Sequence, residues 1–224
     1  MMRSALCAAA LALLAACESP GVEIREEFIQ SAPRSILVLP PLNESIEPIA
    51  TYGALASTTF PLAENGFYVF PVAVVDGMLR ENGLPTPFEM HQVSLEKLRE
   101  VFDCDAVLYL TVSQWGTQYI VVDSQTQVAI RGELVDAVTG ATLWVGQDQV
   151  TTSSNSGGGD IITMLVGSVI NQIATSVEDP SKAVAAQVNN ELLRGPKRGW
   201  PYGPYHPEYD AQLAEMQAVA SNAP

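Results

Sequence analysis

Few positions of this chain combine reactive side chains with the spacing that catalysis or metal binding requires. The two histidines, His91 and His206, are far apart in the sequence, whereas a zinc site needs several ligands at short spacings. Glu89 is close to His91, but a loop contact explains that pair better. No Gly-x-Ser-x-Gly motif occurs, and the glycine run at 157–159 lacks the Lys-Ser/Thr of a phosphate loop and suits a linker. The sequence therefore predicts neither an enzyme nor a cofactor.

One polar triplet stands where α/β folds often bind ligands. Asn43, Glu44 and Ser45 follow the apolar run at 34–39, which two prolines stop. Ligands of open α/β sheets bind at the carboxyl ends of strands. Two interpretations stay open: the triplet contacts a small molecule, or it forms a turn that caps the next helix.

Cys17 ends an apolar run that has the parts of a secretory signal. Arg3 supplies the positive charge, and residues 5–16 supply an apolar segment too short to span a bilayer comfortably. The tetrad Leu14-Ala15-Ala16-Cys17 resembles the bacterial lipobox. That resemblance implies diacylglycerol on the Cys17 sulfur, cleavage before Cys17 and acylation of the new amino terminus. The alternatives are an uncut anchor or a secreted chain with a chance cysteine.

Several acyl chains hold a protein firmly on a membrane, so the domain is expected to be tethered and not embedded. No later run of the sequence is long and apolar enough to span a bilayer. An Asp after the lipidated cysteine marks retention in the inner membrane of many envelope lipoproteins. Residue 18 is Glu18, which favours the outer membrane.

Composition excludes one class of partner. The 224 residues carry a formal charge of −14, and loss of Arg3 with the signal makes the mature chain more acidic still. Nucleic-acid binding needs a basic surface, so that function is excluded. Cys7 leaves with the signal, and Cys104 is then the one cysteine besides Cys17, so no internal disulfide forms. Cys104 is expected to be a small buried side chain; a reactive thiol is the alternative.

The hydrophobic pattern changes along the chain. Up to about residue 112, apolar strands alternate with amphipathic helices; beyond it, apolar and polar residues alternate with a period of two. The expected strands are 34–39, 66–71, 105–112, 119–122, 126–135 and 142–145. The expected helices are 51–65 with a kink or restart at Pro61, 73–82, 95–102 capped by Ser94, one from Asp160 and one from Asp179.

This order of elements predicts an α/β fold, an α+β sandwich with a mixed sheet, a C-terminal antiparallel meander and flanking helices. The run 105–112 is the most apolar and is expected at the centre of the sheet. The expected organisation is a signal peptide at 1–16, a lipid-anchored tether at 17–33, a single domain at 34–195 and a C-terminal tail at 196–224.

The tail is rich in proline and aromatic residues, with Trp200, Tyr202, Tyr205 and Tyr209 spaced between prolines. Proline excludes a long helix through this segment. The tail either straps across the domain or offers its aromatic side chains to a partner. The strap is favoured, because exposed aromatic side chains are costly to leave without contacts.

Several segments resemble a family of bacterial lipoproteins of unknown function that includes a meningococcal surface antigen. The similar segments are 36–45, 61–71, 89–92 and 105–109. The hairpin at 133–144 is similar to hairpins in CsgG-type secretion lipoproteins. The second resemblance implies a fold like the N-terminal domain of TolB and a role in outer-membrane assembly or secretion.

The resulting hypothesis is a lipid-anchored, non-catalytic binding or scaffold subunit of a CsgG-like outer-membrane complex. Its partners would be the membrane, through the lipid, and envelope lipoproteins, and self-association stays open. The alternative is a periplasmic sensor that binds a small molecule or glycan near Asn43, Glu44 and Ser45.

Overall fold

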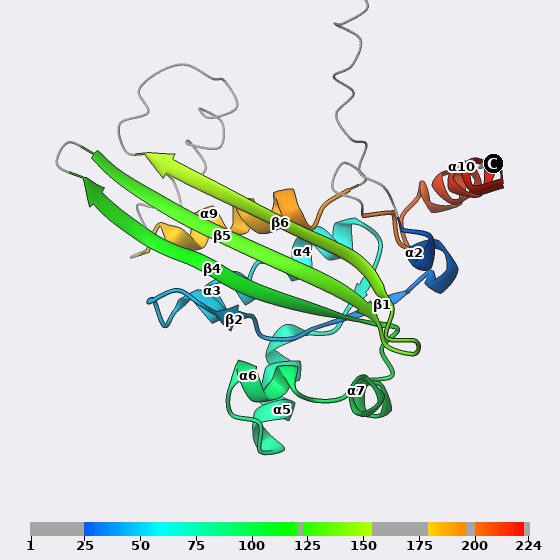
Figure 1. Ribbon diagram of the computed structural model, residues 1–224, viewed down its shortest axis with the longest axis horizontal. Helices are drawn as coiled ribbons and strands as arrows, with labels where there is room; N and C mark the ends of the chain where they lie inside the picture. Colours follow the sequence, from blue (N-terminus) through cyan, green and yellow to red (C-terminus); the bar gives the residue numbers. More distant parts are fainter. Residues whose placement is uncertain (1–24, 121–122, 154–178, 196–199, 222–224) are drawn as a thin grey trace, which may run out of the picture.

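The chain is described by a computed structural model over residues 25–120, 123–153, 179–195 and 200–221. Its centre is a six-stranded mixed sheet of order β3-β1-β4-β5-β6, with β2 paired to β4 (Figure 1). The strands are β1 (Ser35–Val38), β2 (Leu42–Asn43), β3 (Tyr68–Val69), β4 (Ala106–Ile120), β5 (Asp123–Asp136) and β6 (Thr142–Ser153). Strand β1 pairs in parallel with β3 and β4, and β2 pairs in parallel with β4. Strands β4, β5 and β6 form an antiparallel meander. The predicted mixed sheet, its meander and its central strand are confirmed.

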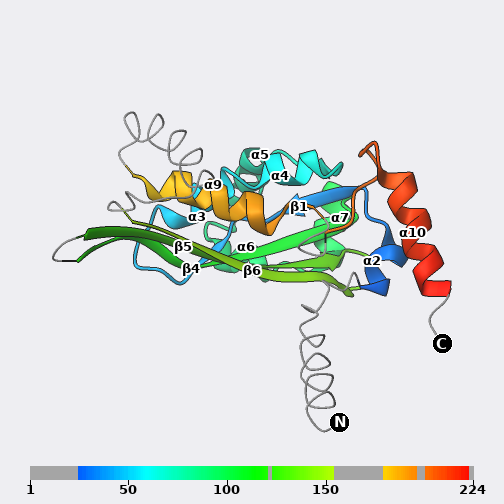
Figure 2. The ribbon, with the colours of Figure 1, turned by 90° about the horizontal axis from the view of Figure 1, so that it is seen from above.

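Helices flank the sheet on both faces. The described helices are α2 (Glu26–Ser31), α3 (Ala50–Leu55), α4 (Thr59–Glu64), α5 (Val72–Glu81), α6 (Pro87–His91), α7 (Leu95–Phe102), α9 (Ser181–Leu192) and α10 (Tyr209–Ser221). Figure 2 shows α3, α4 and α9 in a layer along one face of the long strands. The helices α5, α6 and α7 contribute to a second core with β1 and the start of β4.

The apolar sequence of β1 results from burial on both faces. Ile36 and Val38 belong to the core under α3, α4 and α9, whereas Leu37 and Leu39 belong to the core under α5, α6 and α7. All four side chains are fully buried. A strand covered on both sides needs apolar residues at successive positions, which explains the apolar run within 34–39.

Beyond the start of β4, the meander is covered on one face only. On β5, Val128, Ile130 and Leu134 are buried in the core under α9, whereas Arg131 and Glu133 between them are exposed. This is the alternation that the sequence predicted for 126–135. The opposite face of the long strands is therefore polar, and it carries the candidate site described below.

Two glycines of the meander make room for Trp144. Gly132 and Gly146 are paired across β5 and β6, and a Cβ on Gly132 would lie 3.1 Å from the Trp144 ring. A Cβ on Gly146 would clash with that ring outright. The indole thus occupies the space of two missing side chains, and it stacks at a tilt on Trp200, with ring centroids 4.7 Å apart.

The C-terminal tail packs on the domain as a strap. Trp200 is fully buried, and the backbone N–H groups of Gly203 and Tyr205 donate to the carbonyls of Asn65 (2.7 Å) and Gly66 (3.0 Å). A strap across the domain was the interpretation that the sequence favoured for the tail. The Trp200 side chain lies in the core and not at the surface.

The expected tether is shorter than 17–33. Residues 26–31 form α2, and Phe28 from this helix is buried against Phe67 and Trp200, with ring centroids 6.3 Å apart in both pairs. The sequence of α2 is charged and has one phenylalanine, so it shows no apolar periodicity that would predict a packed helix. The residues that follow Ile24 therefore belong to the domain and not to a linker.

The predicted helix 51–65 is two helices. The hydroxyls of Ser57 and Thr58 donate to the carbonyls of Ala54 and Leu55, which ends α3. The chain restarts at α4, and Pro61 occupies the first turn, where a missing N–H costs little. The restart was one of the two outcomes expected at that proline.

Three further boundaries differ from the prediction. Helix α6 was not among the expected helices, and it begins with a capping box formed by Thr86 and Glu89. The strands expected at 105–112 and 119–122 are joined in β4, because a register shift between Val112 and Gln114 bends the strand without ending it. Strand β6 extends to Ser153, beyond the predicted 145. The helix expected from Asp160 and the glycine run at 157–159 lie outside the described residues.

Candidate functional site

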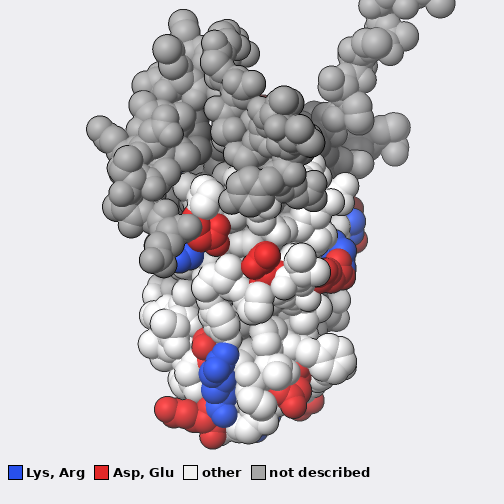
Figure 3. All heavy atoms as spheres, turned by 90° about the vertical axis from the view of Figure 1, so that its left-hand side faces the viewer, with Lys and Arg blue, Asp and Glu red and all other residues white. Residues whose placement is uncertain are grey.

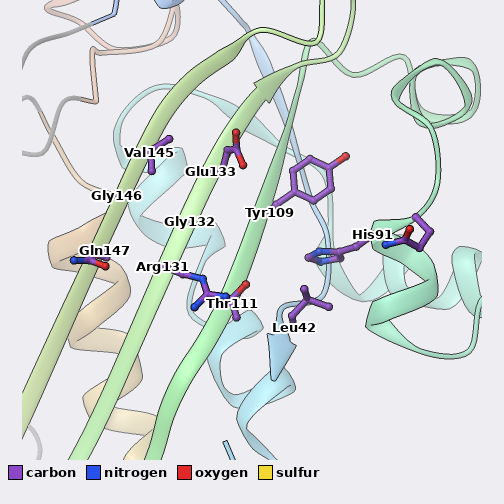
Figure 4. A pocket seen from close by; sticks show the side chains of 11 residues that line it. Leu42, His91, Tyr109, Thr111, Arg131, Gly132, Glu133, Val145, Gly146 and Gln147 are labelled. Atoms are coloured by element: carbon purple, nitrogen blue, oxygen red, sulfur yellow. The ribbon is translucent and has the colours of Figure 1, made fainter. Parts of the chain in front are cut away.

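A groove lies on the polar face of the meander, beside α6 (Figure 4). Its volume is about 650 Å³. The residues that line it are Leu42, His91, Gln92, Tyr109, Thr111, Arg131, Gly132, Glu133, Val145, Gly146 and Gln147. Strands β4, β5 and β6 supply the floor, and β2 and α6 supply one wall. Because the floor is built on paired strands, its side chains have fixed spacing.

The only side-chain ion pair made by the groove's described residues joins Arg131 to Glu44. The guanidinium Nη1 donates to Glu44 Oε2 at 3.0 Å, and Nη2 donates to the other carboxylate oxygen at 2.5 Å. A two-pronged pair of this kind fixes the orientation of the guanidinium plane. Both side chains are about half exposed, so the pair orders the groove margin more than it stabilises the fold.

His91 and Tyr109 form the aromatic end of the groove. The Nε2 atom of His91 lies 2.9 Å from the carbonyl oxygen of Pro40, and because a carbonyl only accepts, Nε2 carries the proton. Burial lowers the pKa of His91, partly offset by this bond, which keeps the ring neutral at pH 7. The His91 and Tyr109 rings meet edge to face at 5.2 Å. Burial raises the pKa of Tyr109, so its hydroxyl stays protonated.

The predicted triplet lies at the margin of the groove. The Asn43 carboxamide accepts from the N–H and hydroxyl of Ser45 (2.9 and 2.7 Å) and donates to the carbonyl of Glu47 (2.8 Å). These bonds form a local turn before α3. Helix α3 has Ile49 at its N-cap and no side-chain cap, so the triplet does not cap it, and contact with a small molecule stays a prediction. Glu44 reaches the groove through Arg131.

The four aromatic residues of the tail have separate environments. Trp200 is buried, and Tyr202 stacks on His206 with ring centroids 3.7 Å apart. Tyr209 starts α10 and lines a small crevice with Phe28. Tyr205 is 61% exposed, and its hydroxyl accepts a long hydrogen bond from Arg34 (3.4 Å). Tyr205 is therefore the most accessible of the four.

The lipidation motif Leu14-Ala15-Ala16-Cys17 lies outside the described residues. Cys104 is 1% exposed in the core under α5, α6 and α7, and burial raises the pKa of its thiol to about 11. The expected role as a buried side chain is confirmed for Cys104, and a thiol with that pKa is a poor nucleophile at pH 7.

The histidines and Glu89 take structural roles. Glu89 closes the capping box of α6, and His91 contacts Pro40. Over the described ranges, no group of three or more His, Cys, Asp or Glu side chains is placed to hold a metal ion. Over the same ranges, no helix has both the length and the apolar character needed to cross a bilayer.

Sequence reasoning missed the groove residues Tyr109, Arg131 and Gln147. The alternation in 126–135 placed Arg131 and Glu133 on the exposed face, which was the available signal. That β2 and α6 would stand beside this face depends on long-range pairing of β2 with β4, which no local pattern encodes.

The fold and site define a class: a mixed-sheet α/β domain with a polar groove on an open sheet face. A family model described as "Putative lipoprotein GNA1162-like" matches residues 25–205. The chain belongs to this GNA1162-like family.

A protein sequence and a crystal structure from Neisseria meningitidis are similar to the chain. The chain is 42% identical over 201 residues to "Putative lipoprotein NMB1124/NMB1162" of Neisseria meningitidis serogroup B, covering 84% of this chain and 93% of that protein. The crystal structure of lipoprotein GNA1162 from Neisseria meningitidis matches with a TM-score of 0.54 and 47% identity, over 64% of this chain and 99% of that one. The PelC dodecamer from Paraburkholderia phytofirmans is a more remote match, with a TM-score of 0.45 and 16% identity, over 71% of this chain and 86% of that one.

Proposed function

We propose that this chain is a lipid-anchored, non-catalytic binding subunit of an outer-membrane assembly or secretion complex, of the CsgG kind. The lipobox at Leu14-Ala15-Ala16-Cys17 and membership of a family named for lipoproteins support the anchor. Glu18 supports the outer membrane. The tether then holds the domain near its partners, so binding takes place at a high local concentration.

The observation that carries the proposal is a concentration of exposed apolar side chains on neighbouring elements. We name these residues the apolar surface: Ile49, Tyr52, Phe60, Tyr68, Val74 and Met78, on α3, α4, β3, α5 and the residue before α3. Phe60 is 62% exposed and Val74 is 55% exposed. Large apolar side chains grouped on a surface mark interaction sites in soluble domains.

Contacts hold the elements of the apolar surface together. Tyr52 on α3 bonds Arg80 on α5, and its ring lies 5.4 Å from the Arg80 guanidinium. Asp76 pairs with Arg80 at 3.0 Å. Helix α4 contacts β3, which leads directly into α5. The surface is therefore rigid, and rigid apolar surfaces lose little entropy on binding.

Charge is unevenly distributed on this end of the molecule. Figure 3 shows acidic and basic side chains beside one another in small clusters, with uncharged surface between the clusters. A chain of formal charge −14 that leaves uncharged surface on one face is suited to docking an apolar partner surface with a charged rim.

The docking claim is tested by purification from the native envelope in a mild detergent, followed by mass spectrometry of the companions. We expect a stoichiometric companion lipoprotein with the wild type and its loss with Phe60→Asp or Val74→Asp. Val138→Asp is the matched control, because Val138 is 67% exposed on the β5–β6 hairpin, away from the apolar surface. Equal recovery of the companion with all three variants would refute docking through this surface.

The anchor is tested by metabolic labelling with a radioactive fatty acid. Wild type is expected to take up the label and to sediment with outer membranes, whereas Cys17→Ala is expected to do neither. Cys104→Ala serves as the control, because Cys104 is buried and cannot accept an acyl chain. Label retained by Cys17→Ala would overturn the lipid anchor.

A further inference from the structure

The groove on the polar sheet face continues along the strands. A second hollow of about 330 Å³ shares Arg131 and Gln147 with it and adds Ser113, Ala129, Ile130, Asp148 and Gln149. Register places these side chains in rows across the strands, because Arg131 pairs with Thr111 and Gln147, and Glu133 pairs with Tyr109 and Val145. From Glu133 to Ala129 the floor runs four residues, about 13 Å along the strand. The site is therefore elongated and open at its face.

Polar groups without partners project into this groove. Over the described residues, the side chains of Gln92, Thr111 and Gln147 and the hydroxyl of Tyr109 make no hydrogen bond. Figure 4 shows Tyr109, Thr111 and Gln147 on the floor, with Arg131 and Glu133 between them. Two carboxamides and two hydroxyls can each donate and accept. Such a set matches a ligand that also donates and accepts at many points.

The groove offers no free cationic side chain among the residues that line it. Arg131 is held by both oxygens of Glu44, and burial lowers the pKa of His91, so its ring is neutral at pH 7. Glu133 accepts from the hydroxyl of Thr142 at 2.7 Å. An anionic ligand would find no free cation among these residues and would approach an acidic protein, so charge disfavours an anionic ligand. The polar groups that remain suit a neutral ligand that forms hydrogen bonds.

We infer that this groove binds a short neutral oligosaccharide. Sugar hydroxyls donate and accept in the way that the free carboxamides and hydroxyls require, and the apolar faces of sugar rings can pack on the half-buried ring of Tyr109, which His91 holds in place. An extended peptide is less suited to the site, because peptides dock on sheets through backbone bonds to an edge, whereas this groove is a sheet face of side chains. The inference is independent of the apolar surface on α3, α4, β3 and α5.

The test is saturation-transfer NMR on the full lipidated chain in a detergent without a sugar headgroup. The probes are cellotriose and chitotriose, which are neutral, trigalacturonate, which is anionic, and a capped alanine tripeptide. We expect saturation transfer to a neutral trisaccharide. Gln147→Leu and Tyr109→Phe should each weaken its affinity about three- to tenfold, the range for loss of one neutral hydrogen bond.

Gln127→Leu is the matched control, because Gln127 lies on the same face of β5 beyond the groove, and it should bind like the wild type. Three results would overturn the inference: no transfer to either neutral trisaccharide, unchanged affinity in Gln147→Leu and Tyr109→Phe, or tighter binding of trigalacturonate or the tripeptide. Failure of the docking proposal would appear separately, as unchanged recovery of a companion with Phe60→Asp.

Discussion

Four aromatic rings join the two ends of the described domain. Phe28 comes from the N-terminal helix α2, and Trp200 comes from the C-terminal strap. These two rings and that of Phe67 contact one another edge to face, with ring centroids 6.0 to 6.3 Å apart. Trp144 from β6 lies against Trp200. Edge-to-face contacts add to the burial of each ring, so this cluster is a main contributor to stability.

Trp200→Ala is expected to destabilise the protein by about 3–5 kcal/mol, because it removes a fully buried indole and leaves a cavity. The free energy of unfolding from urea titration measures this loss. Tyr205→Ala on the same strap is the comparison and should cost no more than about 0.5 kcal/mol, because Tyr205 is mostly exposed. Similar losses for both variants would show that the strap does not pack as described.

Gly66→Ala is expected to destabilise the protein by more than about 1 kcal/mol. Gly66 has φ +86, and a Cβ there would clash with the backbone of His206 on the strap. Gly77→Ala in the middle of α5 is the control, since no atom lies within 4 Å of the added Cβ. That change should stabilise by up to about 1 kcal/mol through helix propensity. Thermal or urea unfolding measures both changes in stability, and we expect a loss for Gly66→Ala and a gain for Gly77→Ala.

Asp136 makes stability depend on pH. Burial acts to raise the pKa of Asp136, but hydrogen bonds from Ser31, Thr139 and Val138 outweigh burial and hold the pKa below its ordinary value. Because the folded pKa is the lower one, this stabilisation is complete above the unfolded pKa of about 3.9 and is lost as the pH falls through the folded pKa.

Asp136→Asn should therefore lower stability at pH 7 and weaken the loss of stability below about pH 4. Urea titrations at a series of pH values measure both effects. Asp210→Asn provides the comparison, because Asp210 is exposed on α10. An acid profile of Asp136→Asn that is parallel to the wild type would contradict the role of this carboxylate.

At the scale of elements, the strap holds the turn between α4 and β3. The buried Asn65 donates from its side chain to the carbonyl of Leu193 (2.6 Å) and accepts from the N–H of Gly195 (3.0 Å), while its own carbonyl receives the N–H of Gly203. One asparagine thus connects α4, the end of α9 and the strap. Buried polar groups with full sets of bonds specify one arrangement of the elements.

Two truncations separate the strap from α10. Deletion of 210–224 leaves Trp200 and the bonds to Asn65 and Gly66 in place, so we expect a folded protein with a modest loss of stability. Deletion of 196–224 removes the buried indole and should destabilise the domain by several kcal/mol. Circular dichroism with urea titration compares them, and equal stability of both truncations would exclude a structural role for the strap.

The elements with periodic patterns could be predicted from the sequence. The alternation in 126–135 predicted β5, and the apolar runs at 34–39 and 105–112 predicted β1 and the central part of the sheet in β4. Helix α2 could not be predicted, because its packing depends on Phe28 meeting Trp200 from the other end of the chain. Helix α6 was missed although Thr86 and Glu89 carry a capping signature, because neighbouring prolines are typical of a loop.

For the candidate sites, too, local sequence was informative, whereas contacts between distant residues could not be predicted. Glu44 was chosen for its place after a strand, and its partner Arg131 is 87 residues away, so the pair depends on the register of the sheet. Trp200 was expected to face a partner or the domain, and composition alone does not distinguish a buried indole from an exposed one. Exposure of Phe60 inside a predicted helix likewise depends on how α4 meets the sheet.

At the scale of the whole molecule, the two cores and the two surfaces have different roles. Burial on both faces of β1 and β4 makes the sheet a rigid frame. The frame carries the polar groove on the open face of the meander and the apolar surface on α3, α4, β3 and α5. The proposed lipid at Cys17 would restrict this domain to the membrane surface, where both surfaces stay accessible to envelope partners.

Docking through the apolar surface is tested most directly by site-specific photo-crosslinking in intact cells. A photoreactive amino acid would replace Phe60 in one strain and Val138 in another, since both positions are exposed and tolerate a bulky side chain. Our account predicts a discrete adduct with an envelope protein from position 60 and none from position 138. The absence of an adduct at position 60, or the same adduct from both positions, would contradict it.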